Sequence, residues 1–420
     1  MTPALRAILF GSAFEPAATV AFDFLRARYR VGPGGGSTPD FAALPGLSVI
    51  RASSGYAETA AGNFVLFPPN VARITDKGLL PEEARTNAIP NSTMVGATAS
   101  ALPTGWSFQA AAGLTQAVVG TGVEFGLPYV DWSITGTASG SVFPGIFTSA
   151  ANVAAAVNGQ AWTSSFYARV VSGALPANLN NLLQIYSAAP TYLGITASSG
   201  SAAASFTRRV ASGTIADAST AYVRQALSMS VANLTVVNVV IRVYAPQLEQ
   251  GAFVTSPIPT TSAAATRAAD NVSLLLSSTL VAPFTVSTVV DLPAIDGVER
   301  YLASIYDAAV GSVNGMLLRR TNINAARLNV ISSSASALVD PAGTYTGAFK
   351  MRFAGRVRAA GFSAAANGSA IGSLSKTAPV DLQKVYLGSL AGSANFANGY
   401  IERLIIQGDT TDAELQARAA

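Results

Sequence analysis

Apolar and polar side chains alternate in short stretches along most of the chain. Between residues 162 and 171, Trp162 and Phe166 fall on one side of the alternation, and Tyr167 and Arg169 fall on the other. A period of two residues indicates a half-buried β-strand. Residues 234–244 hold a nearly continuous run of Val and Ile, which is typical of a central strand in a sandwich. Neither half of the chain shows a layer of amphipathic helices, so the pattern favours antiparallel sheets.

The strand pattern resumes after residue 271. Further strands are expected at residues 284–292, 301–306, 315–320, 326–332, 349–358, 384–388 and 400–407. The pair Asn367-Gly368 is typical of a tight hairpin turn. Thr411 followed three residues later by Glu414 matches a capping box, so a short helix is expected from about Thr411.

Two breaks divide the strands into groups: residues 32–40 are rich in Gly and Pro, and residues 257–270 are rich in Pro, Thr, Ser and Ala. Before the first break, Arg26, Arg28 and Arg30 alternate with apolar residues, which indicates a strand with one basic face. We therefore predict an all-β protein of tandem antiparallel β-sandwiches of the jelly-roll type, with an extended N-terminal segment. The expected parts are an attachment segment with the Gly-rich loop at 1–40, a turn-rich connecting region at 41–90, one sandwich at 91–260 and a second at 271–420.

The composition excludes several classes of function. The 420 residues include no Cys and no His, which excludes disulfides, thiol nucleophiles, zinc fingers and Ser-His-Asp triads. The formal charge is +4 and no run of basic residues is present, so we expect no nucleic-acid partner. No stretch of about 18 apolar residues exists, so we expect no membrane insertion. Because only 11% of the residues are charged, weak electrostatic repulsion favours an oligomer.

Two longer segments carry a resemblance to a known family. The first is GLLPEEARTN at 78–87, preceded by NVAR at 70–73, and the second is APQLEQGAFVTSPIPT at 245–260, followed by RAAD at 267–270. Together with IRASSGY at 50–56, they resemble tail-fibre and head-spike proteins of bacteriophages and phage-like particles. The resemblance covers roughly residues 48–270. It implies that the two segments open and close a jelly roll similar to carbohydrate-binding modules, although Pro81 stands where the family usually has an aliphatic residue.

A further resemblance concerns the C-terminal part of the chain. The sequence VYLGS at 385–389, the run GYIERL at 399–404 and the final AELQARA are similar to the end of laminin-G or concanavalin-like sandwiches. In such sandwiches, a closing strand leads into a short helix. This resemblance covers about residues 271–420.

Carbohydrate binding is the function for which the sequence offers specific residues, because aromatic faces stack on sugar rings and polar side chains hydrogen-bond to hydroxyls. Trp132 lies beside Tyr129 and Asp131 in the stretch LPYVDWS, which we interpret as a loop and as the first candidate. Tyr186 and Tyr192 come next. Asp131 could instead hold a structural calcium ion, and no other cofactor is expected.

The other tryptophans, Trp106 and Trp162, are expected in the core. Trp162 falls on an alternating strand, and Trp106 follows Pro103 and Gly105. In modules of the family that the chain resembles, a Trp at that place usually packs inside.

Catalysis is not expected. A glycosidase needs two carboxylates on either side of the scissile bond, and three pairs were considered: Glu82 with Glu83, Asp291 with Asp296, and Asp409 with Asp412. Adjacent residues in an extended segment point apart, and carboxylates at a helix start favour its free amides. The first pair is expected to make structural ion pairs, and no other pair has a clear catalytic setting.

We therefore expect a non-catalytic fibre or spike on the surface of a virion or phage-like particle that binds host cell-surface polysaccharide. The expected partners are identical copies in a trimer or pentamer, and other particle proteins that contact the N-terminal segment. A purely structural decoration protein and a polysaccharide depolymerase are the alternatives.

Overall fold

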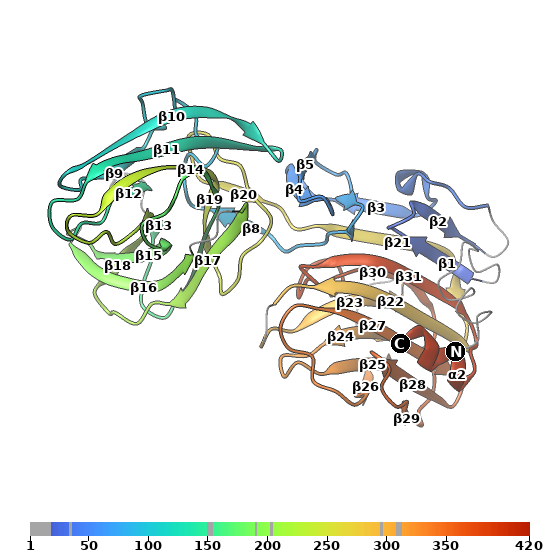
Figure 1. Ribbon diagram of the computed structural model, residues 1–420. Coiled ribbons are helices and arrows are strands. Elements are labelled where there is room, and N and C mark those ends of the chain that lie inside the picture. Colours follow the sequence, from blue (N-terminus) through green and yellow to red (C-terminus); the bar gives the residue numbers. More distant parts are fainter. Residues whose placement is uncertain are drawn as a thin grey trace. The chain divides into compact units, whose positions relative to one another are not determined.

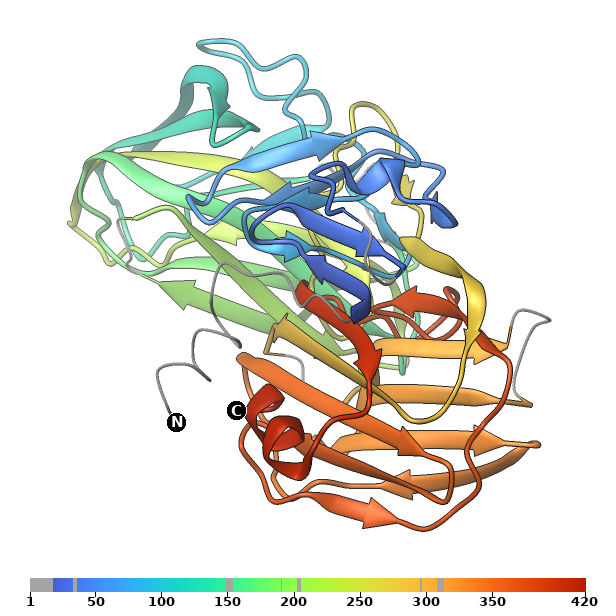
Figure 2. The ribbon, with the colours of Figure 1, turned by 90° about the vertical axis from the view of Figure 1, so that its right-hand side faces the viewer.

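The computed structural model describes residues 18–32, 36–148, 154–189, 191–201, 205–294, 297–307 and 313–420. Nearly all of its regular structure is antiparallel β-sheet, which confirms the predicted all-β sandwich fold (Figures 1 and 2). The chain divides into two compact units. Unit 1 contains residues 1–61, 67–84 and 268–420, and unit 2 contains residues 62–66 and 85–267.

Unit 1 contains a nine-stranded and a seven-stranded sheet. The first has the order β2-β1-β31-β22-β27-β28-β29, and the pair β6-β7 attaches to β31. Its strands are β1 (Ala18–Asp23), β2 (Arg28–Val31), β6 (Ile74–Thr75), β7 (Gly78–Leu79), β22 (Phe284–Leu292), β27 (Phe349–Arg358), β28 (Gly361–Ala366), β29 (Gly372–Leu374) and β31 (Tyr400–Gly408). The second has the order β26-β25-β24-β23-β30-β21-β3. Its strands are β3 (Leu47–Ile50), β21 (Asn271–Leu280), β23 (Arg300–Asp307), β24 (Gly315–Arg320), β25 (Ala326–Ser332), β26 (Ala335–Val339) and β30 (Leu382–Leu387).

The N-terminal part of the described chain belongs to this sandwich, which corrects the expected division into separate segments 1–40 and 41–90. Strand β1 pairs with β31 near the C-terminus, and β2 pairs with β1. The expected single strand with one basic face is instead a hairpin, whose turn includes Ala27 at φ 48°. Phe22 and Tyr29 from this hairpin are buried in the core of unit 1, so hydrophobic packing holds it in the sheet. Residues 1–17 of the expected attachment segment lie outside the described residues.

The C-terminal helix α2 (Asp412–Arg418) confirms the predicted capping box. The Thr411 side chain accepts from the Glu414 backbone amide, and the Glu414 carboxylate accepts from the Thr411 amide. Leu415 packs against Ala354 and Ala365 of the nine-stranded sheet. Within the described residues, no helix is long and apolar enough to span a bilayer.

Unit 2 is a second sandwich, with a five-stranded sheet in the order β10-β11-β19-β14-β17 and a six-stranded sheet in the order β16-β15-β18-β12-β9, to which β13 is attached through β18. Strands β8 (Arg85–Asn87) and β20 (Ala265–Arg267) pair where the chain enters and leaves it. The other strands are β9 (Trp106–Gln109), β10 (Leu114–Glu124), β11 (Leu127–Thr137), β12 (Gly145–Thr148), β13 (Ala154–Ala155), β14 (Ala161–Gly173), β15 (Leu179–Ser187), β16 (Tyr192–Ser201), β17 (Thr207–Thr214), β18 (Thr220–Ser228) and β19 (Val236–Gln250). The remaining elements of the described chain are two short strands, β4 (Gly55–Glu58) and β5 (Phe64–Phe67), and the 3-10 helix η1 (Phe41–Ala43).

The core of unit 2 forms between its two sheets. Trp106 and Trp162 lie in it, as predicted. The Val- and Ile-rich strand β19 has β11 on one side and β14 on the other, which confirms its predicted central place. Val239, Ile241 and Val243 alternate inward along it because successive side chains of a strand point to opposite faces.

A buried ionic cluster gathers residues from the family-like segments into unit 1. Arg51 and Arg73 are fully buried, and Glu82 and Asp270 are 4% and 1% exposed. Arg51 Nη1 donates to Asp270 Oδ1 at 2.8 Å, and Arg73 Nη1 donates to Glu82 Oε2 at 2.8 Å. Arg73 also pairs with Asp270 through Nε and Nη2. The expectation that Glu82 is structural is therefore confirmed.

The charges in this cluster balance. Burial lowers the pKa of Arg73, but the carboxylates of Asp270 and Glu82 more than offset burial and raise it. Backbone groups also join Asp270 and Glu82. The Asp270 amide donates to the Glu82 carbonyl at 2.9 Å, and the Glu82 amide donates to Asp270 Oδ2 at 3.0 Å. The cluster thus ties together the two places where the chain leaves and re-enters unit 1.

We predict that Asp270→Asn destabilises unit 1 strongly, because it leaves two buried guanidinium groups without their shared carboxylate. Removing one partner of a buried ion pair costs about 3–5 kcal/mol. Denaturant unfolding of the full chain, followed by circular dichroism, measures the loss. Asp340→Asn is the matched control, because its pair with Arg327 is partly exposed and its loss changes stability little. Equal effects of the two substitutions would contradict the prediction.

Candidate functional site

The stretch around Trp132 is a strand and not the expected loop. Residues 127–137 form β11, which pairs with β10 and β19. Val130, Trp132 and Ile134 point into the core, and Trp132 is 0% exposed. Its ring therefore cannot stack on a sugar, and Trp132 is withdrawn as a binding candidate. Strand alternation places Tyr129 and Asp131 on the opposite, outer face.

Asp131 and Tyr129 belong to an ion-pair network on the outer face of the five-stranded sheet. Both Asp131 oxygens accept from Arg242, at 2.7 and 2.8 Å, and the Arg242 guanidinium lies 3.6 Å from the centre of the Tyr129 ring. Glu124 accepts from Arg242 at 3.0 Å and from Arg169 at 2.9 Å. Two carboxylates and two guanidinium groups neutralise one another here. The Asp131 carboxylate is therefore engaged, which leaves it poorly placed for calcium.

The network changes the ionisation of its members. Burial raises the pKa of Glu124, but hydrogen bonds from Arg169, Tyr244 and Arg242 outweigh it and lower that pKa to about 2. Tyr244 shares the Glu124 carboxylate, and burial together with that hydrogen bond raises the pKa of its phenol. The network carries no net charge and links the strands β10, β11, β14 and β19.

Tyr186 and Tyr192 lie together on the outer face of the other sheet of unit 2. They occupy paired positions on β15 and the edge strand β16, and their ring centres are 5.6 Å apart at an interplanar angle of 61°. Tyr192 is 50% exposed. The structure thus brings together the second pair of sequence candidates, at a distance from the first.

Arg224 of β18 lies at the centre of this surface. Its guanidinium carbon is 4.4 Å from the ring centre of Phe147 on β12 and 4.6 Å from that of Tyr186. Its Nη2 and Nε donate to Gln184 Oε1 at 2.8 and 3.1 Å, and Nη2 also donates to the Tyr186 hydroxyl. Burial lowers the pKa of Arg224. Stacking and hydrogen bonds hold the side chain in one place.

These side chains line a groove of about 520 Å³, within the size range of small-ligand sites. Its walls are aromatic or aliphatic at Phe143, Phe147, Tyr186, Tyr192 and Ile195, and polar at Gln109, Gln184, Arg224 and Ser228. None of the described lining residues is acidic. An apolar wall with a few placed hydrogen-bonding groups is the usual form of a ligand site.

A second groove, of about 460 Å³, lies within unit 1 beside η1. Its aromatic residues Tyr29 and Phe41 are 2% and 5% exposed. Its polar residues serve the fold, since Asp40 caps the Ala42 amide and Asn70 accepts from the Arg51 amide. This groove offers a ligand less than the one around Arg224.

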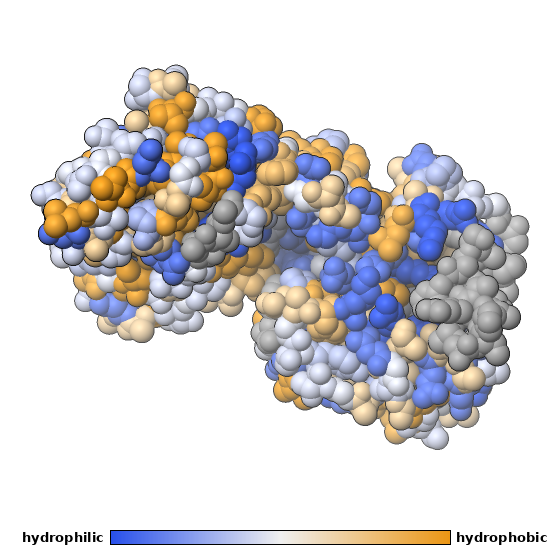
Figure 3. All heavy atoms as spheres, viewed as in Figure 1, coloured by the Kyte–Doolittle hydropathy of each residue, from blue (hydrophilic) through white to orange (hydrophobic). Residues whose placement is uncertain are grey.

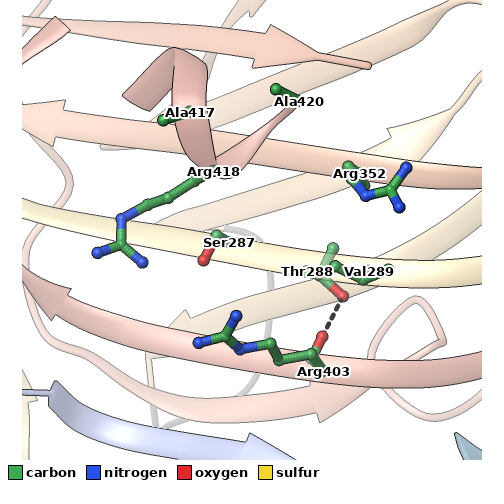
Figure 4. Close-up of a pocket in the computed structure, with 8 residues that line it drawn as sticks. All are labelled: Ser287, Thr288, Val289, Arg352, Arg403, Ala417, Arg418 and Ala420. Atoms are coloured by element: carbon green, nitrogen blue, oxygen red, sulfur yellow. Dashed lines mark hydrogen bonds between the residues drawn. The ribbon is translucent and has the colours of Figure 1, made fainter. Parts of the chain in front are cut away.

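A third hollow lies on the nine-stranded sheet beside α2, lined by Arg352, Arg403 and Arg418 (Figure 4). Its volume is about 30 Å³, which holds about one water molecule. Arg403 and Arg418 extend to the same side, whereas Arg352 points away from them (Figure 4). The three guanidinium groups do not converge on one point, so they are not arranged to bind one anion together.

In each pair considered for catalysis, at least one carboxylate is held in a structural contact or lies outside the described residues. Glu82 is buried against Arg73, Asp409 bonds to Arg358 at 3.0 Å, and Asp412 bonds to Arg356 at 2.6 Å. Asp296 lies outside the described residues. Among the residues that are described, no three Asp or Glu side chains group as a metal site would require.

Sequence reasoning missed Arg224, Gln184 and Phe147. They come from β18, β15 and β12, and they meet because Gln184 stands opposite Arg224 and Phe147 stands opposite Ala226, two residues beyond it. The alternation within β18 could have placed Arg224 on an outer face. The order of the strands brings the three residues together, and this order cannot be predicted from any one segment of the sequence.

No protein-family model matches this chain, and no curated protein matches its sequence. Several solved structures are similar in fold. The Ruminococcus gnavus IT-sialidase CBM40, bound to alpha2,6 sialyllactose, is 19% identical, with a TM-score of 0.29 over 33% of this chain and 83% of that one. A native heptameric SAP-like pentraxin from Limulus polyphemus is 12% identical, with a TM-score of 0.28 over 35% of this chain and 75% of its own. At these values, the likeness concerns the β-sandwich fold and assigns no ligand to this chain.

We predict that the outer network on the five-stranded sheet stabilises unit 2 in a pH-dependent way. Because the folded pKa of Glu124 is about 2 against an ordinary 4.5, its contribution is complete above pH 4.5 and is lost as the pH falls towards 2. Glu124→Gln should therefore lower stability at pH 7 and leave it nearly unchanged at pH 2. Urea unfolding at both pH values measures this. An equal loss at both would show that the carboxylate charge is not responsible.

Proposed function

We propose that this chain is a non-catalytic carbohydrate-binding protein and that saccharides bind in the groove around Tyr186, Tyr192 and Arg224. The observation that carries the proposal is the joint presence of half-exposed aromatic rings and fixed polar side chains in one groove of ligand size. An aromatic face packs on the C–H face of a sugar ring. Gln184 and Arg224 supply donors for its hydroxyl and ring oxygens.

We further propose that the protein works on the surface of a virion or phage-like particle, where it adheres to host polysaccharide. This part of the proposal rests on the resemblance carried by residues 50–87 and 245–270. Arg51, Arg73, Glu82 and Asp270 of these segments form buried ion pairs, so the same segments also build the fold. Attachment through the N-terminal segment belongs to the same proposal.

A homo-oligomer, trimer or pentamer, is the third part of the proposal. Apolar side chains reach the surface of β10, where Val119 and Val123 are 50% and 69% exposed, and hydrophobic residues appear along this region of unit 2 (Figure 3). Covering them with an identical neighbour would remove apolar surface from water. Repeated copies would also raise avidity for a polymeric ligand.

Tyr192→Ala tests the groove directly. Tyr192 is half exposed on an edge strand, so its loss disturbs the fold little, while it removes a stacking surface. We predict that affinity for a bound oligosaccharide falls by about tenfold, which corresponds to about 1.4 kcal/mol. A glycan array identifies the oligosaccharide, and titration calorimetry measures the change.

Tyr129→Ala is the control for Tyr192→Ala. It removes a tyrosine ring from the five-stranded sheet of the same unit, where the ring lies against Arg242. If wild type and Tyr192→Ala bind the oligosaccharide with equal affinity, the binding site does not include Tyr192 and the proposed location is wrong. If no saccharide on the array and no host capsule binds, while particles still incorporate the protein, the purely structural alternative stands.

The depolymerase alternative has its own test. Purified protein incubated with host capsule should release no new reducing ends, because Glu82, Asp409 and Asp412 are engaged by arginines. A colorimetric reducing-end assay with a known glycosidase as positive control measures this. Appearance of reducing ends that grow with time would overturn the non-catalytic assignment.

A further inference from the structure

Arg224 is the one charged side chain among the described residues that line the groove, and no described carboxylate neutralises it. All of its contacts are with neutral groups: Gln184, the Tyr186 hydroxyl, and the ring faces of Phe147 and Tyr186. The described walls of the groove therefore carry a net charge of +1.

Two donors in the groove are left open. The Gln184 Oε1 atom accepts from Arg224 and from the Tyr186 hydroxyl, which turns its Nε2 away from them. Neither this Nε2 nor Arg224 Nη1 donates to a described residue, and neither is among the enclosed polar atoms without a partner. Donors of this kind are suited to an oxygen acceptor, above all an anionic one.

Arg242 on the other face of unit 2 supplies the contrast. It too lies against a tyrosine ring, but both of its charge-bearing edges meet Asp131 and Glu124. The same guanidinium–tyrosine contact is thus neutralised on the five-stranded sheet and left open on the six-stranded sheet. Arg224 is only partly buried, and a counter-charge that reached it in the groove would gain a charge-assisted hydrogen bond.

We infer that the groove selects acidic saccharides: an anionic group of the ligand accepts from Arg224 Nη1 while the sugar ring lies against Tyr192. This inference rests on the proposed carbohydrate binding and adds the class of ligand. The guanidinium group remains protonated at physiological pH, and the rings of Phe147 and Tyr186 hold it before a ligand arrives. Little ordering remains to be done on binding, which favours affinity.

Pairs of ligands that differ only in charge test the inference. Tetragalacturonic acid and its methyl ester form the carboxylate pair, and a sulfated galactan tetrasaccharide and its desulfated form make up the sulfate pair. Calorimetric titration of the full chain should show at least one acidic member binding about tenfold more tightly than its neutral counterpart, as expected for a charge-assisted hydrogen bond. Which pair shows the difference separates a carboxylate ligand from a sulfate ester.

Variants separate the charge from the stacking surface. Arg224→Gln should remove the preference for the acidic member, because losing the positive charge weakens binding of the acidic member more than binding of the neutral one. Tyr192→Ala should weaken both members by a similar factor. Arg352→Gln changes the net charge of the protein equally, on unit 1, and should keep the preference. Far-ultraviolet circular dichroism and a melting curve show whether each variant is folded.

The outcomes distinguish the inference from the proposed function. Equal binding of acidic and neutral members to the wild type overturns the inference and leaves carbohydrate binding intact. The same holds if the preference survives in Arg224→Gln. Failure of both pairs and of the whole glycan array to bind overturns the proposed function, and the inference with it.

Discussion

Two arginines and two carboxylates, all buried, are the interaction on which the rest of unit 1 depends. Each charge by itself would cost several kcal/mol to remove from water, so Arg51, Arg73, Glu82 and Asp270 must be buried as a set. Asp270 lies 188 residues from Glu82 along the chain, yet their backbones are hydrogen-bonded. The cluster therefore fixes where the chain departs towards residues 85–267 and where it returns. It gives residues 50–56, 70–87 and 267–270 a structural role.

A similar principle separates the two outer faces of unit 2. On the five-stranded sheet, Arg242 sits between a tyrosine ring and two carboxylates, and all of its charge is balanced. On the six-stranded sheet, Arg224 sits between two aromatic rings and neutral acceptors. A balanced network stabilises a fold and offers a ligand nothing. A guanidinium group without a counter-charge can still gain binding free energy from an anionic ligand. The presence or absence of a counter-charge, and not the residue type, therefore distinguishes the two faces.

The sequence predicted what depends on local pattern and missed what depends on pairing. The alternation along residues 162–171, the Val- and Ile-rich strand β19 and the capping box at Thr411 each act within one element, and the structure has them all. Trp132 was misplaced because Tyr129 and Asp131 suggested a polar loop, although Val130, Trp132 and Ile134 have the period of an inward face. Arg224, Gln184 and Phe147 could not be grouped, because strand order brings together residues 147, 184 and 224.

The small number of charged side chains limits how strongly the protein surface can attract a ligand from a distance. Arg51, Arg73, Arg267, Arg300 and Arg320 are among the largest fully buried side chains of the described chain, so a share of the few charges never faces solvent. A surface with few charges provides little long-range attraction, and at physiological salt such attraction fades within about 8 Å. The recognition that we propose for the groove would then come from short-range contacts with Arg224, Gln184 and the tyrosines. If single sites of that kind bind weakly, repeated copies of a site would raise avidity for a polymeric ligand.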